Sequence, residues 1–231
     1  MDQTTGDNKI TSEAIKPKSY LNANKAVLIF LVLNFFSISA MIYFSYYNSK
    51  MIILKSTDNR LLAAAYCGAT VLGDEFHDSI EGASSVSEQR HHQNVVDLTK
   101  IAEKFHIDCI YTMFKGSSGE IALTSISSTQ KDIATKSYYK FFTTYKTPGE
   151  LISKTFGGDK IHYEEVIDEY GHFRTVAIPM KSKEGKNYLA AADTLMSDIT
   201  DHLNHILFTF LFAGLIIFVI SGFVFSYIIK K

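Results

Sequence analysis

The sequence has no excess of charge of either sign. Its 23 Lys and Arg residues are balanced by 24 Asp and Glu residues, so the formal net charge is −1. A near-neutral chain without a basic run lacks the electrostatic footprint of a nucleic-acid-binding protein, which excludes nucleic acid as the main partner. Low-complexity tracts and repeats of solenoid period are also absent.

Motifs for metal binding and for catalysis are missing as well. Cys67 and Cys109 are the only cysteines, and neither belongs to a Cys/His ligand spacing or to a haem-attachment motif. His91 and His92 are adjacent, so their side chains diverge on a helix and do not form a metal-binding pair. No nucleophile and base form a recognisable pair. The sequence therefore predicts no cofactor, no metal site and no enzymatic activity.

Two long apolar runs stand out against this background. The stretch from Ala26 to Asn48 has no charged residue, and the stretch from Leu203 to Ile229 is interrupted only by His205. A helix of ~20 residues crosses the ~30 Å hydrocarbon core of a bilayer. A buried core helix seldom has so long an uncharged run, and a signal peptide has a shorter one followed by a small-residue cleavage site. We therefore expect transmembrane helices at 26–48 and 205–229.

Lysines near the ends of these runs indicate the orientation. By the positive-inside rule, the N-terminal tail (1–25) and the C-terminal end (230–231) are both cytoplasmic. Residues 49–204 then form one extracytoplasmic domain, and the chain is a two-pass protein of a bacterial inner (plasma) membrane with the lipid bilayer as its surroundings. The lysines concerned are Lys9, Lys16, Lys18, Lys25, Lys230 and Lys231.

The middle of the chain has an α+β pattern. Helical spacing of apolar residues extends the first helix to about residue 80. A second helix is predicted at about 86–105, with Ser85 and Glu88 at capping-box spacing. We expect a short helix or ordered loop at 130–145, and short turns that make the last three strands an antiparallel meander. The predicted strands are 107–114, 120–126, 161–167, 172–180 and 187–193.

Three segments in this order resemble one known family. They are YTMFKGSSGEIALTSISST, YGHFRTVAIPMKSKEGKNYLAAADTLMSDI and the shorter GDEFHD. Together with the flanking spans they resemble the single Cache domain, a PAS-like extracellular sensor of bacterial chemoreceptors, sensor kinases and diguanylate cyclases. The resemblance covers about residues 50–205. It implies a PAS-like antiparallel sheet with a long N-terminal helix, flanked by two transmembrane helices.

The resemblance also implies a function in signal transduction. Such a domain binds a small molecule, of amino-acid or carboxylate type, and relays a displacement through the second transmembrane helix to a cytoplasmic output module that these 231 residues do not include. The alternative is a stand-alone two-span subunit whose extracytoplasmic domain docks a partner protein. Gly214 and Gly222 favour close packing of the second span against another helix. A homodimer formed through the long first helix is also expected.

Arg174 and Asp193 are the first candidates for ligand binding. Arg174 shares the face of its strand with Val176 and Ile178, where a guanidinium suits a ligand carboxylate; the alternative is a structural ion pair with an acidic neighbour. The resemblance suggests that Asp193 contacts an amine or hydroxyl of the ligand, and the alternative is an N-cap for the exit helix. The pocket is expected between the sheet and the segment before the third strand.

Further candidates for the pocket are aromatic or polar. Tyrosine combines an apolar ring with a polar tip, which suits small-ligand sites. The alternative is ordinary core packing for the tyrosines, a sheet-ladder position for the serine and a solvated helix position for the histidine. For the two cysteines, an extracytoplasmic location permits a disulfide, and two buried free thiols are the alternative. The pocket candidates are Tyr111, Ser125, Tyr138, Tyr139 and His77.

Overall fold

The computed structural model describes residues 23–116, 119–145, 149–156, 158–168 and 170–231. The described chain divides into two compact units. One consists of the helical residues up to Phe44 together with Thr209–Lys231, and the other of Ser45–Phe208.

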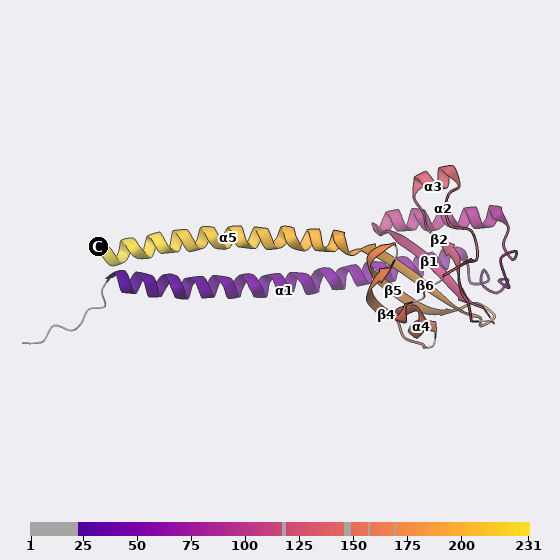
Figure 1. Ribbon diagram of the computed structural model, residues 1–231, viewed down its shortest axis with the longest axis horizontal. Coiled ribbons are helices and arrows are strands. Elements are labelled where there is room, and N and C mark those ends of the chain that lie inside the picture. Colours follow the sequence, from indigo (N-terminus) through magenta and orange to yellow (C-terminus); the bar gives the residue numbers. More distant parts are fainter. Residues whose placement is uncertain (1–22, 117–118, 146–148, 157, 169) are drawn as a thin grey trace, which may run out of the picture. The chain divides into compact units, whose positions relative to one another are not determined.

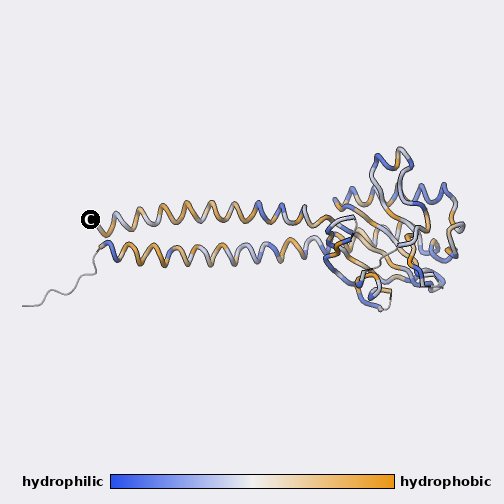
Figure 2. Tube along the Cα trace, in the orientation of Figure 1, coloured by the Kyte–Doolittle hydropathy of each residue, from blue (hydrophilic) through white to orange (hydrophobic). Residues whose placement is uncertain are grey.

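The first unit is built from the ends of two long helices, α1 (Ala23–Leu72) and α5 (Met196–Lys230). Both are long and apolar enough to cross a membrane, and Figure 2 shows the hydrophobic colouring that runs along them. Within the unit, Asn34 donates a hydrogen bond to the hydroxyl of Ser221, and the ring of Phe30 stacks on that of Phe225 at 4.0 Å. The two helices of this unit are therefore packed against each other.

The second unit contains a six-stranded sheet in the order β3-β2-β1-β6-β5-β4, in which every neighbouring pair is antiparallel (Figure 1). The predicted hairpin and the predicted meander are both present, as β1–β2 and β4–β5–β6. The strands are β1 (Cys109–Lys115), β2 (Ile121–Ile126), β3 (Thr143–Thr144), β4 (His162–Asp168), β5 (Gly171–Lys181) and β6 (Asn187–Leu195).

The sheet buries a different set of side chains on each face, because successive residues of a strand point to opposite sides. One face packs on α1 and on α2 (Glu88–Phe105), where Leu61 and Leu98 meet Ile110 and Val176. The other face packs on α4 (Glu150–Phe156) and includes Leu151. Figure 1 shows α2 along one side of the sheet and α4 on the other. The predicted α+β class, with an antiparallel sheet and a long N-terminal helix, is confirmed.

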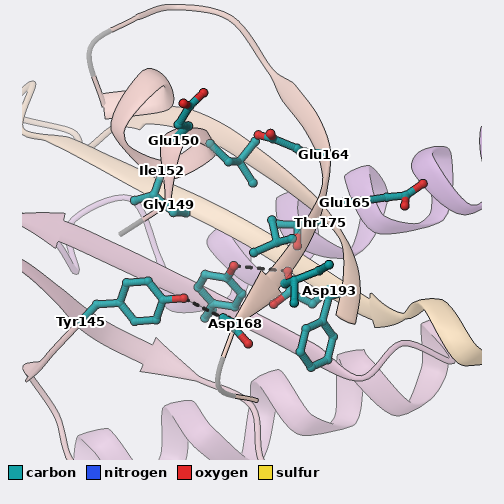
Figure 3. Close-up of a pocket in the computed structure, with 14 residues that line it drawn as sticks. Tyr145, Gly149, Glu150, Ile152, Glu164, Glu165, Asp168, Thr175 and Asp193 are labelled. Atoms are coloured by element: carbon teal, nitrogen blue, oxygen red, sulfur yellow. Dashed lines mark hydrogen bonds between the residues drawn. The ribbon is translucent and has the colours of Figure 1, made fainter. Parts of the chain in front are cut away.

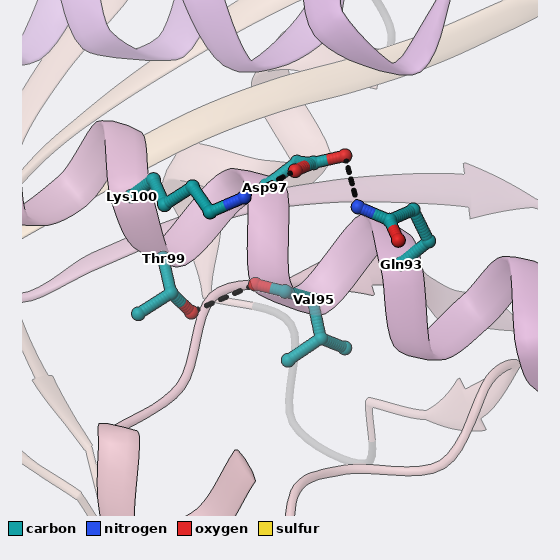
Figure 4. Close-up of polar contacts among 5 residues, drawn as sticks. All are labelled: Gln93, Val95, Asp97, Thr99 and Lys100. Carbon is teal, nitrogen blue, oxygen red and sulfur yellow. Dashed lines mark hydrogen bonds and ion pairs between the residues drawn. The ribbon is translucent and has the colours of Figure 1, made fainter.

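Helix α2 is amphipathic, with one face buried against the sheet and the other exposed to solvent. Its inner face buries Val95 and Leu98, and the buried hydroxyl of Thr99 donates to the carbonyl of Val95. On the outer face, Asp97 accepts hydrogen bonds from Gln93 and Lys100, four and three residues away (Figure 4). Polar pairs at this spacing stabilise a solvated helix surface while the apolar stripe faces the sheet.

The predicted start of α2 and the predicted end of α1 both need correction. The N-cap of α2 is Ser87, whose hydroxyl accepts from the Arg90 amide, whereas Ser85 accepts from amides of the preceding turn. The predicted capping box at Ser85 is therefore wrong. Helix α1 ends at Leu72 rather than near residue 80, because Gly73 adopts a left-handed φ of 90° that ends the helix.

The segment before β4 contains more regular structure than the sequence suggests. The expected short helix is α3 (Gln130–Thr135), and β3 follows it at the edge of the sheet. Helix α4 is not predicted, since its seven residues are too few for a clear periodic pattern. It is nevertheless the element that covers the second face of the sheet.

Candidate functional site

Two adjoining cavities open on the α4 side of the sheet, between the sheet and the segment that precedes β4. Their volumes are about 210 and 260 Å³. This is where the sequence places the pocket. The lining residues common to both cavities are Tyr111, Tyr145, Asp168, Phe173 and Asp193. Because five side chains line both, we treat the two cavities as one site, called here the acidic pocket.

Asp193, near the end of β6, is a carboxylate of the acidic pocket whose pKa is strongly raised. The hydroxyl of Tyr111 on the neighbouring strand β1 donates to its carboxylate at 3.2 Å, and Thr175 on β5 lies beside it in register. Burial raises the pKa of Asp193 to about 7 from its ordinary 3.8, although hydrogen bonds from Thr175 and Tyr111 act in the opposite direction. Its carboxylate therefore sits where ionisation is costly and a cation would relieve the cost.

Asp168 is the second carboxylate common to both cavities. The hydroxyl of Tyr145 donates to Asp168 at 3.2 Å, and the amides of Tyr170 and Gly171 donate to its other oxygen at 2.9 and 3.2 Å. Figure 3 shows the two tyrosine–aspartate hydrogen bonds of the site, with the side chains of Tyr145 and Asp168 pointing toward one another. The turn after β4 thus fixes one carboxylate and β6 the other.

The charge of the acidic pocket has one sign. Among the residues that the structure describes, no Lys, Arg or His lines either cavity. Phe173, Leu151, Met113 and Leu123 supply apolar surface beside the carboxylates. Such a lining attracts a cationic group and repels an anion. The carboxylates in the lining are Asp108, Glu150, Glu164, Glu165, Asp168 and Asp193.

Arg174 lies outside the acidic pocket. It occupies the face of β5 that packs on α1, as its alternation with Val176 and Ile178 indicates, and it forms a two-pronged ion pair with Asp58 of α1. Its Nε and Nη2 atoms donate to the two carboxylate oxygens at 2.8 Å each. The structure thus gives Arg174 a structural partner, and a different one from the acidic neighbours in its own sheet.

Asp193 is not the N-cap of the exit helix. Helix α5 begins at Met196, and Asp108 accepts hydrogen bonds from the Leu195 amide and the Thr194 hydroxyl at 2.8 and 3.0 Å. A carboxylate directly before β1 therefore holds the chain where β6 becomes α5, while Asp193 lines the acidic pocket.

The other sequence candidates are divided between the pocket and the rest of the domain. Tyr111 and Tyr139 line the cavities. Ser125 is buried on the α2 side, where Asn94 donates to it at 3.3 Å. Tyr138 pairs through its hydroxyl with His92 of α2. The structure therefore brings together Asp193, Tyr111 and Tyr139 only.

His77 is buried on the side of the sheet away from the acidic pocket. It stacks on Tyr188 at 3.7 Å and forms a hydrogen bond with Thr124 at 3.1 Å. Burial lowers the pKa of His77 to about 3, so the imidazole is neutral. It packs as a core residue.

The two cysteines are both free thiols. Cys67 is exposed on α1, and Cys109 is partly buried at the start of β1, where it lines the larger cavity. Burial raises the pKa of the Cys109 thiol. The disulfide considered from the sequence is not formed.

Several pocket residues were missed by sequence reasoning. Phe173 and Thr175 alternate with Arg174 on β5, so choosing the opposite face of that strand would have found them. Asp168 ends β4 directly before the turn, a place where a polar side chain often caps the backbone. Tyr145 lies in a segment without a clear periodic pattern and gave no signal.

No protein-family model and no curated protein matches this chain. Similar solved structures include the DcuS sensor domain of E. coli, with 15% identity and a TM-score of 0.45, covering 66% of this chain and 98% of that one. They also include the ligand-binding domain of the Campylobacter jejuni chemoreceptor Tlp3 in complex with L-valine, with 12% identity and a TM-score of 0.43, covering 84% and 68%.

Proposed function

We propose that this chain is a transmembrane sensor whose extracytoplasmic domain binds a small organic ammonium ion in the acidic pocket. The observation behind the proposal is the pairing of a partly buried carboxylate, Asp193, with a lining that has no cationic side chain among the described residues. The role is binding and signalling rather than catalysis.

The preference for an ammonium group follows from electrostatics. Asp193 and Asp168 lie in a half-enclosed cavity where an ionised carboxylate lacks a counter-charge, so a cationic ligand supplies the missing partner. A ligand with only carboxylate groups would meet repulsion from the same side chains. An amino acid satisfies the carboxylates through its amine. The hydroxyls of Tyr111, Tyr145 and Thr175 already donate to Asp193 and Asp168, so each would donate to the ligand carboxylate only by exchanging that hydrogen bond.

The relay is proposed to pass through β6. Asp193 lies three residues before Met196, the first residue of α5, and α5 includes the second apolar run. A ligand that binds Asp193 in only one arrangement of β6 shifts the equilibrium of the helix start toward that arrangement. The recipient on the cytoplasmic side is an output module or a partner membrane protein, in a chain that crosses the inner membrane twice with both ends inside.

We also propose that the sensor is a homodimer through α1. Beyond the first apolar run, this helix exposes Ile52 and Tyr66, which are 69% and 42% exposed and lie on one face because they are close to a whole number of turns apart. Apolar side chains on the open face of a helix are covered by a second copy at little cost.

The proposal is tested by isothermal titration of the full chain in detergent with two sets of compounds. The first set contains ammonium groups (methylammonium, ethanolamine, glycine and valine), and the second contains only carboxylates (acetate and succinate). We expect saturable binding of at least one compound of the first set and of none in the second. Binding of succinate without binding of any amine would refute the ammonium preference.

Asp193→Asn is the matched test of the site, because it keeps the size and the acceptor for Tyr111 while removing the charge. We expect at least a tenfold loss of affinity, since a charged hydrogen-bond partner is worth roughly 1.5–3 kcal/mol. Asp201→Asn, an exposed carboxylate of α5 outside the pocket lining, serves as the control and should bind as the wild type does. Equal losses in both variants would mean that overall charge, and not the pocket, attracts the ligand.

A further inference from the structure

A separate cavity of about 400 Å³ lies at the junction of β6 and α5, on the face of the sheet opposite to the acidic pocket. Thr194 lines it, and in the β5–β6 register Thr194 is paired with Arg174, the residue that faces α1. The neighbouring Asp193 points into the acidic pocket. The lining consists of Ile53, Ser56, Thr57, Arg60, His106, Thr194, Asp198, Ile199 and His202.

Arg60 of α1 is the central feature of this cavity. Its Nε atom is buried and has no hydrogen-bond partner within the described part of the chain, and no ion pair there engages its guanidinium. A buried donor left without a partner costs about 1–3 kcal/mol, more when it is charged. Arg174, by contrast, reaches the same helix and is fully paired with Asp58. The fold thus neutralises one arginine and leaves the other open to the cavity.

The groups around Arg60 are mostly donors. His106 and His202 bring two imidazoles, and Ser56 and Thr57 bring hydroxyls. Asp198 is the one carboxylate in the described lining; it is exposed and accepts a hydrogen bond from Ser197. None of the ion pairs in the described part of the chain joins Asp198 to Arg60. Donors from α1, the end of α2 and α5 therefore converge on one space.

His106 has a left-handed backbone conformation because it ends helix α2. It is the C-cap of α2 in the left-handed region, with φ of 51°, and its amide donates to the carbonyls of Ala102 and Glu103. A side chain is uncommon in this region, and Gly or Asn is the usual occupant. Through the imidazole of His106, the end of α2 joins α1 and α5 in lining the cavity.

We propose that this cavity, called here the Arg60 site, binds a phosphate group. A guanidinium fork with imidazole and hydroxyl donors from several directions suits a tetrahedral oxyanion, whereas a planar carboxylate uses the guanidinium edge alone. The group belongs either to a phospholipid head or to a free phosphate. His202 directly precedes the apolar run that begins at Leu203, so the site adjoins the segment expected to enter the bilayer, where phospholipid headgroups are found.

A bound phosphate would link α1 to the first turns of α5. The Arg60 site and the acidic pocket meet at consecutive residues, Thr194 and Asp193, so occupation of one site changes the geometry available to the other. Such coupling is reciprocal for binding free energies. This coupling rests on the proposed function; phosphate binding at Arg60 does not.

The test uses the full chain in phosphate-free detergent and has two arms. In one, inorganic phosphate is titrated by calorimetry. In the other, native mass spectrometry counts retained phosphatidylethanolamine and phosphatidylglycerol against diacylglycerol with the same acyl chains. We expect saturable binding in at least one arm, with no retention of diacylglycerol. Binding of phospholipid alone assigns the site to a lipid headgroup, and binding of both assigns it to phosphate from either source.

The variants are chosen to separate charge at the site from charge near it. Arg60→Gln should lower the affinity at least tenfold, Arg60→Lys should keep part of it, and Lys55→Gln, an exposed charge of the same helix outside the lining, should not change it. His202→Gln provides a second test if Arg60→Gln does not fold. No saturable binding in either arm, or wild-type affinity in both Arg60→Gln and His202→Gln, overturns the proposal. Asp193→Asn should bind phosphate normally, so failure of the ammonium site leaves this result intact.

Discussion

Asp193→Asn should change how the free energy of unfolding depends on pH, because the variant lacks a carboxyl group whose pKa differs between the folded and unfolded states. In the folded chain its pKa is about 7, against an ordinary value of 3.8. The folded state therefore holds a proton that the unfolded state has released between these two values. A difference of about 3 units is worth about 4 kcal/mol at 1.36 kcal/mol per unit.

The sign follows from the raised pKa. The contribution of Asp193 is fully present below pH 3.8, declines as pH rises, and is lost above about pH 7. The Asn variant has no such group, so its free energy of unfolding should equal that of the wild type near pH 4 and exceed it by up to about 4 kcal/mol at pH 8. Tyr111 keeps an acceptor in the variant, which limits the loss of hydrogen bonding.

Urea unfolding of the full chain in detergent, followed by near-ultraviolet circular dichroism of the tyrosines, measures this difference at pH 4, 6 and 8. Asp201→Asn is the control for the loss of an exposed carboxylate. Parallel pH profiles for the wild type and Asp193→Asn would refute the claim that Asp193 is buried at a cost. The same reasoning predicts that ammonium affinity declines below pH 7, up to about tenfold per unit, as Asp193 takes up a proton.

Three further predictions concern the framework of the domain. Arg174→Met and Asp58→Asn should each destabilise the domain by about 1–3 kcal/mol, because each removes one partner of a partly buried ion pair. The double variant should lose less than the sum of the two, and urea unfolding of all four proteins of this double-mutant cycle measures the difference. Gly68→Ala should cost about 1–3 kcal/mol, since the new Cβ would lie 2.6 Å from a buried side chain of β1, while Gly82→Ala meets nothing within 4 Å and is the control in thermal melts. Ser87→Ala should lose about 1 kcal/mol and speed hydrogen exchange of the first turn of α2, and unchanged exchange would contradict the cap.

The local pattern of apolar, charged and turn residues was sufficient to predict most of the helices and strands. Charge-free runs identify the two apolar helices, and alternation with short turns identifies the β1–β2 hairpin and the β4–β5–β6 meander. These features depend on residues close together in sequence, where periodicity and turn chemistry act directly. Helix α4 escaped prediction because seven residues barely complete two turns.

The site depended on contacts that no local pattern contains. Alternation correctly places Arg174 beside Val176, but it does not say which face of the sheet is covered by α1 and which one keeps a cavity. Asp58 lies 116 residues from Arg174, and Asp108 lies 87 residues from the amide of Leu195 that it caps. Partners so distant in the chain become neighbours only when the sheet and the helices pack, because the strand order and the covering helices decide which carboxylates are paired and which remain open to a ligand.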